Sequence, residues 1–307
     1  MSGRSLPEPR RPDPTDPVRP RALALPAVGG PRIDERRPWL ERADVVDAVS
    51  VPGLDSPLYL DGDGVAVTTT GLGKAEAATT VATLLASAGI DLDGAYVLSA
   101  GVAGAAPARA ALGSVFLADV VVDWDRKHRW DRDDGGPSVA PLAYEPGESV
   151  RRLDPTLVEV AAGTARGAEL TADPAVEAYA DRYPEAGGGE PTVGVGPTVA
   201  GDEFWHGPRH AREVDALCER YGVEPYATTQ MEDSATAAAL DRHGLLGRYL
   251  SVRAVANYDR PAPDQSVEES FDGTEESLAL AIENAGRVGW AVVEGVLSAD
   301  PLGLGEA

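Results

Sequence analysis

Apolar residues occur along the chain in short runs that are rich in β-branched and aliphatic side chains. These runs lie at residues 22–28, 64–70, 96–99, 112–122, 192–195, 223–229 and 249–256, and several end in glycine-rich or polar turns. Segments between them carry apolar residues at helical spacing, at 75–88, 154–166, 174–180, 233–240 and 275–297. Strands that alternate with helices predict an α/β fold, a three-layer αβα domain with a functional site at one edge of its sheet.

The two ends of the chain differ in composition from its middle. Residues 1–20 contain six prolines and many charged residues, so we expect a disordered extension there. Residues 21–300 carry the strand and helix patterns and are expected to form a single domain. A short disordered tail is expected at 301–307.

Gln230, Met231, Glu232 and Asp233 form a polar segment between a predicted strand and an alanine-rich helix. Asp233 or Ser234 is a suitable N-cap for that helix. Open α/β sheets bind ligands where a strand ends and a helix begins, so these side chains are candidates for a functional site. A cluster that only caps the helix, with Met231 in the core, explains the same pattern equally well.

Other candidates lie in turns that follow predicted strands. Gly71 and Gly73 precede Lys74 and a helix, where backbone N–H groups can hold an anion or a ribose oxygen, although tight packing explains the glycines as well. The charged loop after the first strand is expected to be solvated, with Glu35 kept as a candidate. A third turn is made of small residues that let a ligand approach the backbone, namely Gly101, Val102, Ala103 and Gly104.

Phe204 and Trp205 lie side by side in a turn that is rich in glycine and acidic residues. Core packing is the default expectation for both, since aromatic side chains serve in cores as well as in ligand sites. His206 and His210 have a spacing that could bind a metal. No third ligand is evident from the sequence, so we expect no metal site.

The composition excludes some classes of function. The 307 residues include 50 acidic and 27 basic ones, a formal net charge of −23, which opposes sequence-independent binding to nucleic acid. A solvated acidic surface of this kind favours a halophilic cytoplasm. One cysteine, Cys218, permits no internal disulfide, as expected in a reducing compartment. No apolar run approaches the roughly 18 residues of a membrane span, so we expect a soluble cytoplasmic protein without a secretory signal.

The turns also match a known group of proteins in order and spacing. The chain resembles the nucleoside phosphorylase/nucleosidase superfamily at Thr70–Ala78, Ala100–Gly104, Gly201–Phe204, Gln230–Asp233 and Arg253–Asn257. Within it the chain is most similar to the purine nucleoside permease family, at Val51–Leu54, Ser56–Tyr59, Leu112–Ser114, Asn257–Pro261 and Val293–Gly295. The resemblance spans roughly residues 21–297 and implies a single nucleoside phosphorylase-like domain with a central mixed sheet.

The resemblance implies a role for several side chains. Met231 would pack under the ribose of a nucleoside, and Glu232 would accept hydrogen bonds from the ribose hydroxyls. Phe204 would stack on the base. Asn257 matches the residue that donates to purine N7, where the superfamily commonly has aspartate, and Asp259 is a possible substitute for that acid.

The resemblance extends to the turns that surround the predicted sugar site. Gly71 to Gly73 and Gly101 to Gly104 would face the attacking anion or water, and Glu35 resembles an acidic residue that activates water in nucleosidases. Ser99-Ala100 departs from the hydroxyl-bearing pattern of phosphorylases and nucleosidases, so the nucleophile stays open. Gln230 and Asp202 complete the set of residues expected to bind substrate.

The resemblance therefore implies cleavage of purine nucleosides at the N-glycosidic bond, with water or inorganic phosphate as co-substrate and no other cofactor. Such a reaction passes through an oxocarbenium-like sugar, which a carboxylate near the ribose stabilises. The alternative is a nucleoside-binding protein that assists uptake without chemistry, and a nucleoside-sensing regulator is a third possibility. A homo-oligomer is expected, since superfamily members commonly assemble.

Overall fold

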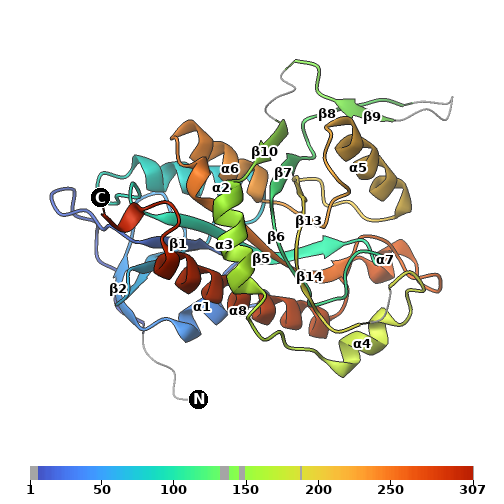
Figure 1. Ribbon diagram of the computed structural model, residues 1–307, viewed down its shortest axis with the longest axis horizontal. Helices are drawn as coiled ribbons and strands as arrows, with labels where there is room; N and C mark the ends of the chain where they lie inside the picture. The colour runs from blue at the N-terminus through green and yellow to red at the C-terminus, as the bar shows by residue number, and fades with distance from the viewer. Residues whose placement is uncertain (1–5, 132–137, 145–148, 187–188, 307) are drawn as a thin grey trace.

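The computed structural model describes residues 6–131, 138–144, 149–186 and 189–306 (Figure 1). Within these residues a mixed sheet of twelve strands runs through the molecule, with helices on both of its faces, and β8 and β9 form a separate pair. The strands are β1 (Ala22–Leu25), β2 (Val45–Val49), β3 (Leu58–Asp61), β4 (Val65–Val67), β5 (Tyr96–Ala105), β6 (Val115–Leu117), β7 (Val120–Asp123), β8 (Lys127–Arg129), β9 (Val139–Pro141), β10 (Val150–Arg152), β11 (Val193–Val195), β12 (Thr198–Ala200), β13 (Thr228–Gln230) and β14 (Tyr249–Tyr258).

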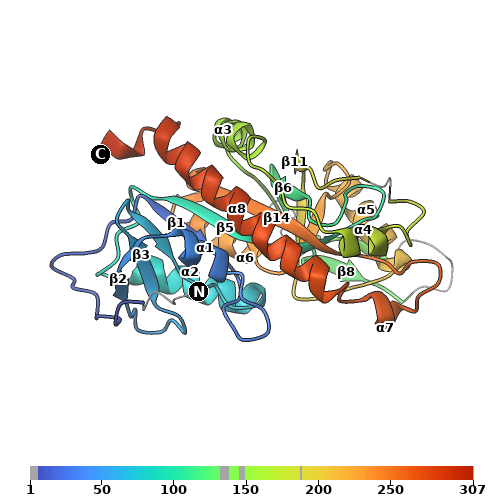
Figure 2. The same cartoon turned by 90° about the horizontal axis from the view of Figure 1, so that it is seen from below.

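The helices cover a range of lengths from one turn to seven turns. The longest is α8, and Figure 2 shows it lying obliquely across the sheet. The helices are α1 (Arg37–Arg42), α2 (Gly73–Ala86), α3 (Pro155–Ala165), α4 (Pro174–Ala180), α5 (Pro208–Arg220), α6 (Asp233–Arg242), α7 (Val267–Ser270) and α8 (Glu275–Ala299), with 3₁₀ turns at η2 (Leu246–Arg248) and η3 (Leu304–Glu306).

The strand β5 holds the sheet together because it pairs along both edges. Its first four residues pair in parallel with β1, and its other edge pairs in parallel with β14 over nearly its whole length. Near its end, Gly104 pairs with Thr229 of β13. Because β13 is antiparallel to β5 at this pair, its last residue lies beside the part of β5 that precedes Gly104, while β14 ends beside the end of β5. The last residues of β13 and β14 therefore both lie next to the second half of β5.

Two consecutive residues of β5 define the layers on either side of the sheet, since neighbours in a strand point to opposite faces. Ala100 faces α8, where a Cβ on Gly289 would lie 3.4 Å from the Ala100 side chain. Ser99 is hydrogen-bonded to Tyr249, which also bonds to Asp233 at the start of α6. The helices α1 and α3 pack against α8, and α2 packs against α6, which confirms the three-layer αβα architecture.

Most of the predicted elements are confirmed, with differences at several places. The strand β5 runs to Ala105, beyond the predicted end at residue 99, because the small residues of the supposed turn continue its pairing with β14. The helix α5 and the hairpin of β2 and β3 were not predicted. The helix α1 forms in the charged segment expected to be a loop, with Trp39 buried against α8.

The chain ends also differ from the expectation of disorder, within the part that is described. The Arg10 backbone pairs with the edge strand β2, and its side chain forms an ion pair with Asp47 at 2.7 Å. Val18 pairs with Ile90. Near the other end, the backbone N–H of Leu302 donates to the Tyr96 hydroxyl at 3.1 Å. Backbone pairing therefore orders residues whose composition does not predict order. Residues 1–5 and 307 lie outside the described chain.

Candidate functional site

A cavity of about 670 Å³ opens where β5, β13 and β14 end. Ten of the predicted site residues line it, from five different segments of the chain: Glu35, Val102, Ala103, Gly104, Phe204, Gln230, Met231, Glu232, Asn257 and Asp259. Gly71, Gly73, Gly101 and Asp202 are absent from the lining, but three of them contact residues that line it or would do so with an added Cβ. The Gly71 N–H donates to the carbonyl oxygen of Ala27, the Gly73 N–H donates to Glu232, and a Cβ at Gly101 would meet Glu35. Asp202 accepts from the backbone N–H of Lys74.

Glu232, which lines the cavity, forms a buried ion pair with Arg253. Arg253 Nη1 donates to Glu232 Oε2 at 3.2 Å, and the backbone N–H of Gly73 donates to Glu232 Oε1 at 3.0 Å. The side chains of Glu232 and Arg253 are 4% and 3% exposed. Two donors from separate elements thus fix the Glu232 carboxylate at the edge of the cavity.

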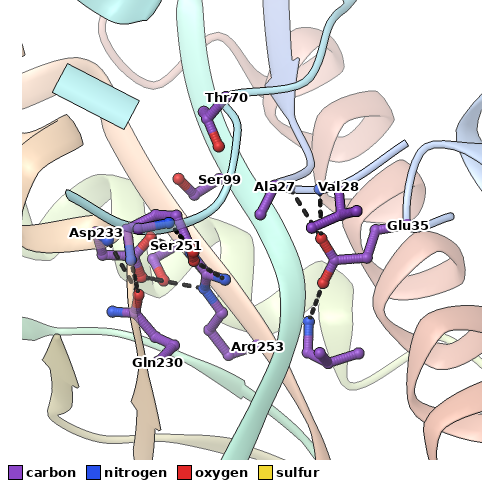
Figure 3. Close-up of polar contacts among 12 residues, drawn as sticks. Ala27, Val28, Glu35, Thr70, Ser99, Gln230, Asp233, Ser251 and Arg253 are labelled. Carbon is purple, nitrogen blue, oxygen red and sulfur yellow. Dashed lines mark hydrogen bonds and ion pairs between the residues drawn. The ribbon is translucent and has the colours of Figure 1, made fainter. Parts of the chain in front are cut away.

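Asp233 neutralises the other side of the Arg253 guanidinium. Arg253 Nε donates to Asp233 Oδ2 at 3.2 Å, and Nη2 makes a short contact with Oδ1. Ser251 adds a hydrogen bond to the same carboxylate at 2.5 Å (Figure 3). The Tyr249 hydroxyl adds another at 2.9 Å. Burial opposes the charge on Asp233, but Arg253 and these hydroxyls together lower the pKa of its carboxyl. A buried charge that is fully hydrogen-bonded in this way is stable in the interior.

Glu232 has a different electrostatic environment from its neighbour Asp233. Burial raises the pKa of the Glu232 carboxyl to about 7, and Arg253 and the Gly73 N–H only partly oppose that shift. The nearby carboxylates of Glu35 and Asp233 raise it further. Near neutral pH, Glu232 can therefore be either a hydrogen-bond acceptor or a proton donor toward a ligand.

Glu35 reaches the same cavity from the turn after β1. Its Oε2 accepts hydrogen bonds from the backbone N–H groups of Ala27 and Val28 at 2.9 and 3.0 Å, and its Oε1 accepts from Val102 at 2.7 Å (Figure 3). Burial raises the pKa of this carboxyl, against the effect of the three donors. A Cβ at Gly101 would lie only 2.6 Å from Oε1, so this position needs glycine.

Gln230 binds the first backbone N–H groups of α6, a role that we expected of Asp233 or Ser234. Its Oε1 accepts from the backbone N–H groups of Glu232 and Asp233 at 2.6 and 3.0 Å, and its Nε2 donates to Thr198 at 3.4 Å. The predicted N-cap, Asp233 or Ser234, is therefore wrong, because the Asp233 side chain is turned inward to Arg253. Gln230 holds the start of α6 in place instead.

Phe204 lines the cavity, and the neighbouring Trp205 contributes to the lining as well. The Phe204 side chain is 51% exposed and its ring lies 4.5 Å from that of Phe271, so the default of core packing is wrong for Phe204. Trp205 does pack in the core, against Trp124 and Tyr226.

Asn257 and Asp259 lie near the end of β14, where a register shift between Val255 and Asn257 interrupts the pairing with β5. Asn257 Nδ2 donates to the carbonyl oxygens of Tyr258 and Phe271 at 3.3 and 3.2 Å. Asp259 accepts from Arg260 Nε at 2.6 Å and makes a short contact with the Tyr226 hydroxyl. Both side chains line the cavity, but each is held by protein groups.

The glycine turn before α2 is also held by protein groups. The backbone N–H of Lys74 donates to Asp202 Oδ1 at 2.6 Å. The Lys74 ammonium lies 2.7 Å from Asp123 and 3.2 Å from Asp125. Gly71 and Gly73 both have positive φ, and a Cβ at Gly73 would lie 2.7 Å from Asp202, so both backbone conformation and close packing favour glycine there.

The two histidines with metal-capable spacing have separate partners. His206 Nε2 is hydrogen-bonded to Ser270 at 2.8 Å, and His210 Nδ1 lies 3.3 Å from Glu213. Within the described residues, no group of three or more His, Cys, Asp or Glu side chains could hold a metal ion.

Arg253 is a residue of this buried cluster to which the sequence analysis gave no role. It lies in an apolar run of β14, and its burial to 2% exposure shows that it points into the fold. A lone arginine inside a central strand must be paired with an acid, so Arg253 was itself a signal of a buried ion pair. The sequence does not show that its partners are Glu232 and Asp233, because Asp233 is 20 residues away along the chain.

Comparison with known proteins finds chains with similar sequences. A family model described as purine nucleoside permease (NUP) matches residues 30–299. A purine nucleoside permease from Candida albicans is 26% identical over 297 residues, which cover 86% of this chain and 72% of that protein. A probable purine nucleoside permease from Schizosaccharomyces pombe is 26% identical over 260 residues, 75% of each chain.

Solved structures with the same fold include two nucleoside-related hydrolases. The 5′-methylthioadenosine/S-adenosylhomocysteine nucleosidase from Neisseria meningitidis, in complex with methylthio-immucillin-A, has a TM-score of 0.61 and 19% identity, and covers 90% of this chain and 99% of its own. Futalosine hydrolase from Helicobacter pylori has a TM-score of 0.59 and 17% identity, with 90% and 97% covered. Within the described residues, no helix has both the length and the apolar character needed to cross a membrane.

Proposed function

Since the chain belongs to the purine nucleoside permease family, we propose that it binds purine nucleosides in the cavity and cleaves their N-glycosidic bond. The observation that carries this proposal is the pair of buried carboxylates, Glu35 and Glu232, that line one cavity with Arg253 beside them. Both have a raised pKa, as is common for groups that exchange protons or bind developing charge. The nucleosidases that share the fold support the same chemistry.

In the proposed complex the ribose lies over Met231 and its hydroxyls donate to Glu232. Cleavage of the bond between sugar and base places positive charge on the ribose ring, and a fixed carboxylate beside the ring stabilises that charge more in the transition state than in the ground state. The two donors on Glu232 hold it in place before the substrate binds, which limits reorganisation during the reaction. The base lies between Phe204 and Asn257.

The second candidate function is nucleoside binding that serves uptake without cleavage. Asn257 favours this alternative because an amide cannot protonate the leaving base, and its Nδ2 is already bonded to two carbonyl groups. Asp259, the expected substitute, is bound by the Arg260 guanidinium and the Tyr226 hydroxyl, so protein groups already occupy its carboxylate. The family name and the names of the relatives also agree with a role in transport.

Base release from adenosine, inosine and guanosine separates the two functions. The purified protein is incubated in concentrated salt, which suits its acidic surface, and free base is separated from nucleoside by chromatography. Calorimetry measures nucleoside binding in the same buffer. Release of base supports the enzyme, and binding without release supports the uptake-associated protein. If neither is detected, the cavity is not a purine nucleoside site.

A further inference from the structure

We propose that the cavity excludes inorganic phosphate because the chain's own carboxylates fill its anion-binding positions, so that water accepts the ribose in the cleavage. This inference rests on the proposed function and adds the identity of the second substrate. Three observations carry it: the donors around Glu35, the donors at the start of α2, and the pairing of the cationic side chains.

The first anion-binding position is the group of backbone N–H donors from Ala27, Val28 and Val102. Two of them follow the strand β1 and the third lies within the neighbouring strand β5, and all converge on one carboxylate at the cavity wall (Figure 3). Converging backbone N–H groups of this kind bind phosphate in many proteins. Here all three donate to the Glu35 carboxylate, at 2.9, 3.0 and 2.7 Å.

The second position is the N-terminus of α2, a helix of fourteen residues that follows a glycine turn. Its first N–H groups and its dipole would favour an anion. The Gly73 N–H donates to Glu232 at 3.0 Å, and the Lys74 N–H donates to Asp202 at 2.6 Å. Two carboxylates from distant parts of the chain thus occupy the donors that a phosphate would need.

The cationic side chains nearby are paired as well. Arg253 is bound to Glu232 and Asp233, and the Lys74 ammonium to Asp123 and Asp125. The cavity lining holds six acidic residues, and Arg32, which is exposed to solvent, is its one cationic residue among the described positions. A phosphate with one to two negative charges would meet repulsion in this cavity without a free cluster of donors to offset it.

Water is a neutral nucleophile, so the acidic residues that line the cavity do not repel it. A water molecule loses one proton to the Glu35 carboxylate while its oxygen bonds to the ribose C1′ carbon. The bond from C1′ to the base nitrogen breaks, its electron pair leaves with the base, and the base takes up a proton from solvent. The products are ribose and the neutral base, and the proton on Glu35 returns to solvent.

The first test is the dependence of the reaction on phosphate. Base release from the accepted nucleoside is measured in phosphate-free buffer and with 50 mM phosphate added, at about constant ionic strength. We expect equal rates within twofold, ribose as the only sugar product, and one ¹⁸O atom in the ribose when the reaction runs in H₂¹⁸O. A rate that needs phosphate, or ribose 1-phosphate among the products, overturns the inference.

The second test measures phosphate binding directly and does not depend on catalysis. Titration of the wild-type protein with inorganic phosphate is expected to give no binding by calorimetry up to 10 mM, about the limit of such a titration. Saturable binding below that concentration that also competes with nucleoside overturns the inference. Because this measurement needs no turnover, it decides the inference even if no base is released and the proposed function itself fails.

The variants Glu35→Gln and Glu35→Ala separate the two roles of Glu35. Glu35→Gln keeps the position filled but removes the base, so turnover should fall at least 100-fold while nucleoside binding changes less than threefold. Glu35→Ala vacates three N–H donors, and added formate should restore part of the lost rate. Wild-type turnover in Glu35→Gln contradicts the step assigned to Glu35, and thermal unfolding confirms that each variant is folded.

Discussion

Arg253 Nη1 lies 3.2 Å from Glu232 Oε2, and the two residues are 2% and 3% exposed. The same guanidinium binds Asp233 through its other nitrogens, so one arginine holds two consecutive acidic residues at the start of α6. Arg253 therefore links the strand β14 to the helix α6 and sets the position of the carboxylate that faces the cavity. The stability of the fold and the geometry of the site depend on the same ion pair.

Replacement of Arg253 by methionine should strongly destabilise the protein. The substitution leaves the Asp233 carboxylate buried without its counter-ion, and breaking a buried pair in this way costs about 3–5 kcal/mol. Denaturant unfolding at pH 7 measures the loss. Arg37→Met, at an exposed position of α1, is the matched control and should change the free energy of unfolding by less than about 0.5 kcal/mol. Equal effects in the two variants would contradict the account of the pair.

The raised pKa of Glu232 predicts a pH dependence of stability. Its carboxyl titrates at about 7 in the folded protein and at 4.5 ordinarily, so between these values the folded state binds more protons than the unfolded state. Stability relative to Glu232→Gln should therefore fall by about 3 kcal/mol as pH rises from 4.5 to 7, and stay level above that range. Paired unfolding curves across this range measure the difference. A difference that rises with pH would show that the pKa is lowered.

Alanine at Gly101 should displace Glu35. The added Cβ would lie 2.6 Å from Glu35 Oε1 and 3.1 Å from Arg253 Nη1, and both side chains are confined by burial. We expect a loss of about 1–3 kcal/mol in stability and a fall of roughly 100-fold in the rate of base release.

Gly163→Ala is the control for this substitution. Nothing lies within 4 Å of a Cβ at that position of α3, and alanine there should stabilise the helix by roughly 0.5–1 kcal/mol without changing the rate. A Gly101→Ala protein with wild-type activity would mean that Glu35 need not occupy its observed position.

Aspartate at position 257 should supply the acid that the site lacks. The Asn257 amide faces the carbonyl oxygens of Tyr258 and Phe271, and a carboxyl in its place would favour the protonated form, which donates to those oxygens or to the base. Release of adenine from adenosine should rise by roughly 100-fold or more, as general acid catalysis typically gives.

A nucleoside with a 7-methylated purine is the matched control for Asn257→Asp. Its base already carries a positive charge and leaves as a neutral molecule without being protonated. The substitution should therefore leave the rate for this substrate unchanged. An equal gain for both substrates would assign the effect to a change in binding or structure.

The sequence predicts the layers of the fold and the place of the site for clear physical reasons. The apolar runs of β1, β5 and β14 and the helical spacing of α8 indicate elements that must be buried. The polar segment at Glu232 lies where such a sheet places its ligands. The contacts that hold that segment were not predictable in the same way, because Arg253 and Asp233 are 20 residues apart and pair through the tertiary fold.

Other elements were missed although a local signal existed. The helix α5 begins with Pro208, and its buried residues Ala211, Val214, Leu217 and Cys218 follow helical spacing. In contrast, nothing local indicates that Arg10 pairs with β2, since a proline-rich charged segment is fixed there by an edge strand that sequence patterns do not reveal. In both the fold and the site, the contacts that could not be predicted are those between residues far apart in the chain.

The measurement that tests the central claim most directly compares wild-type protein with Glu232→Gln for base release and for nucleoside binding. Glutamine preserves the shape of the side chain but removes the charge that would stabilise the oxocarbenium-like sugar. We predict that wild-type protein releases base and that the variant loses at least about 100-fold of that rate while it remains folded. Wild-type rates in the variant would contradict the assignment of Glu232, and with it the site proposed for this cavity.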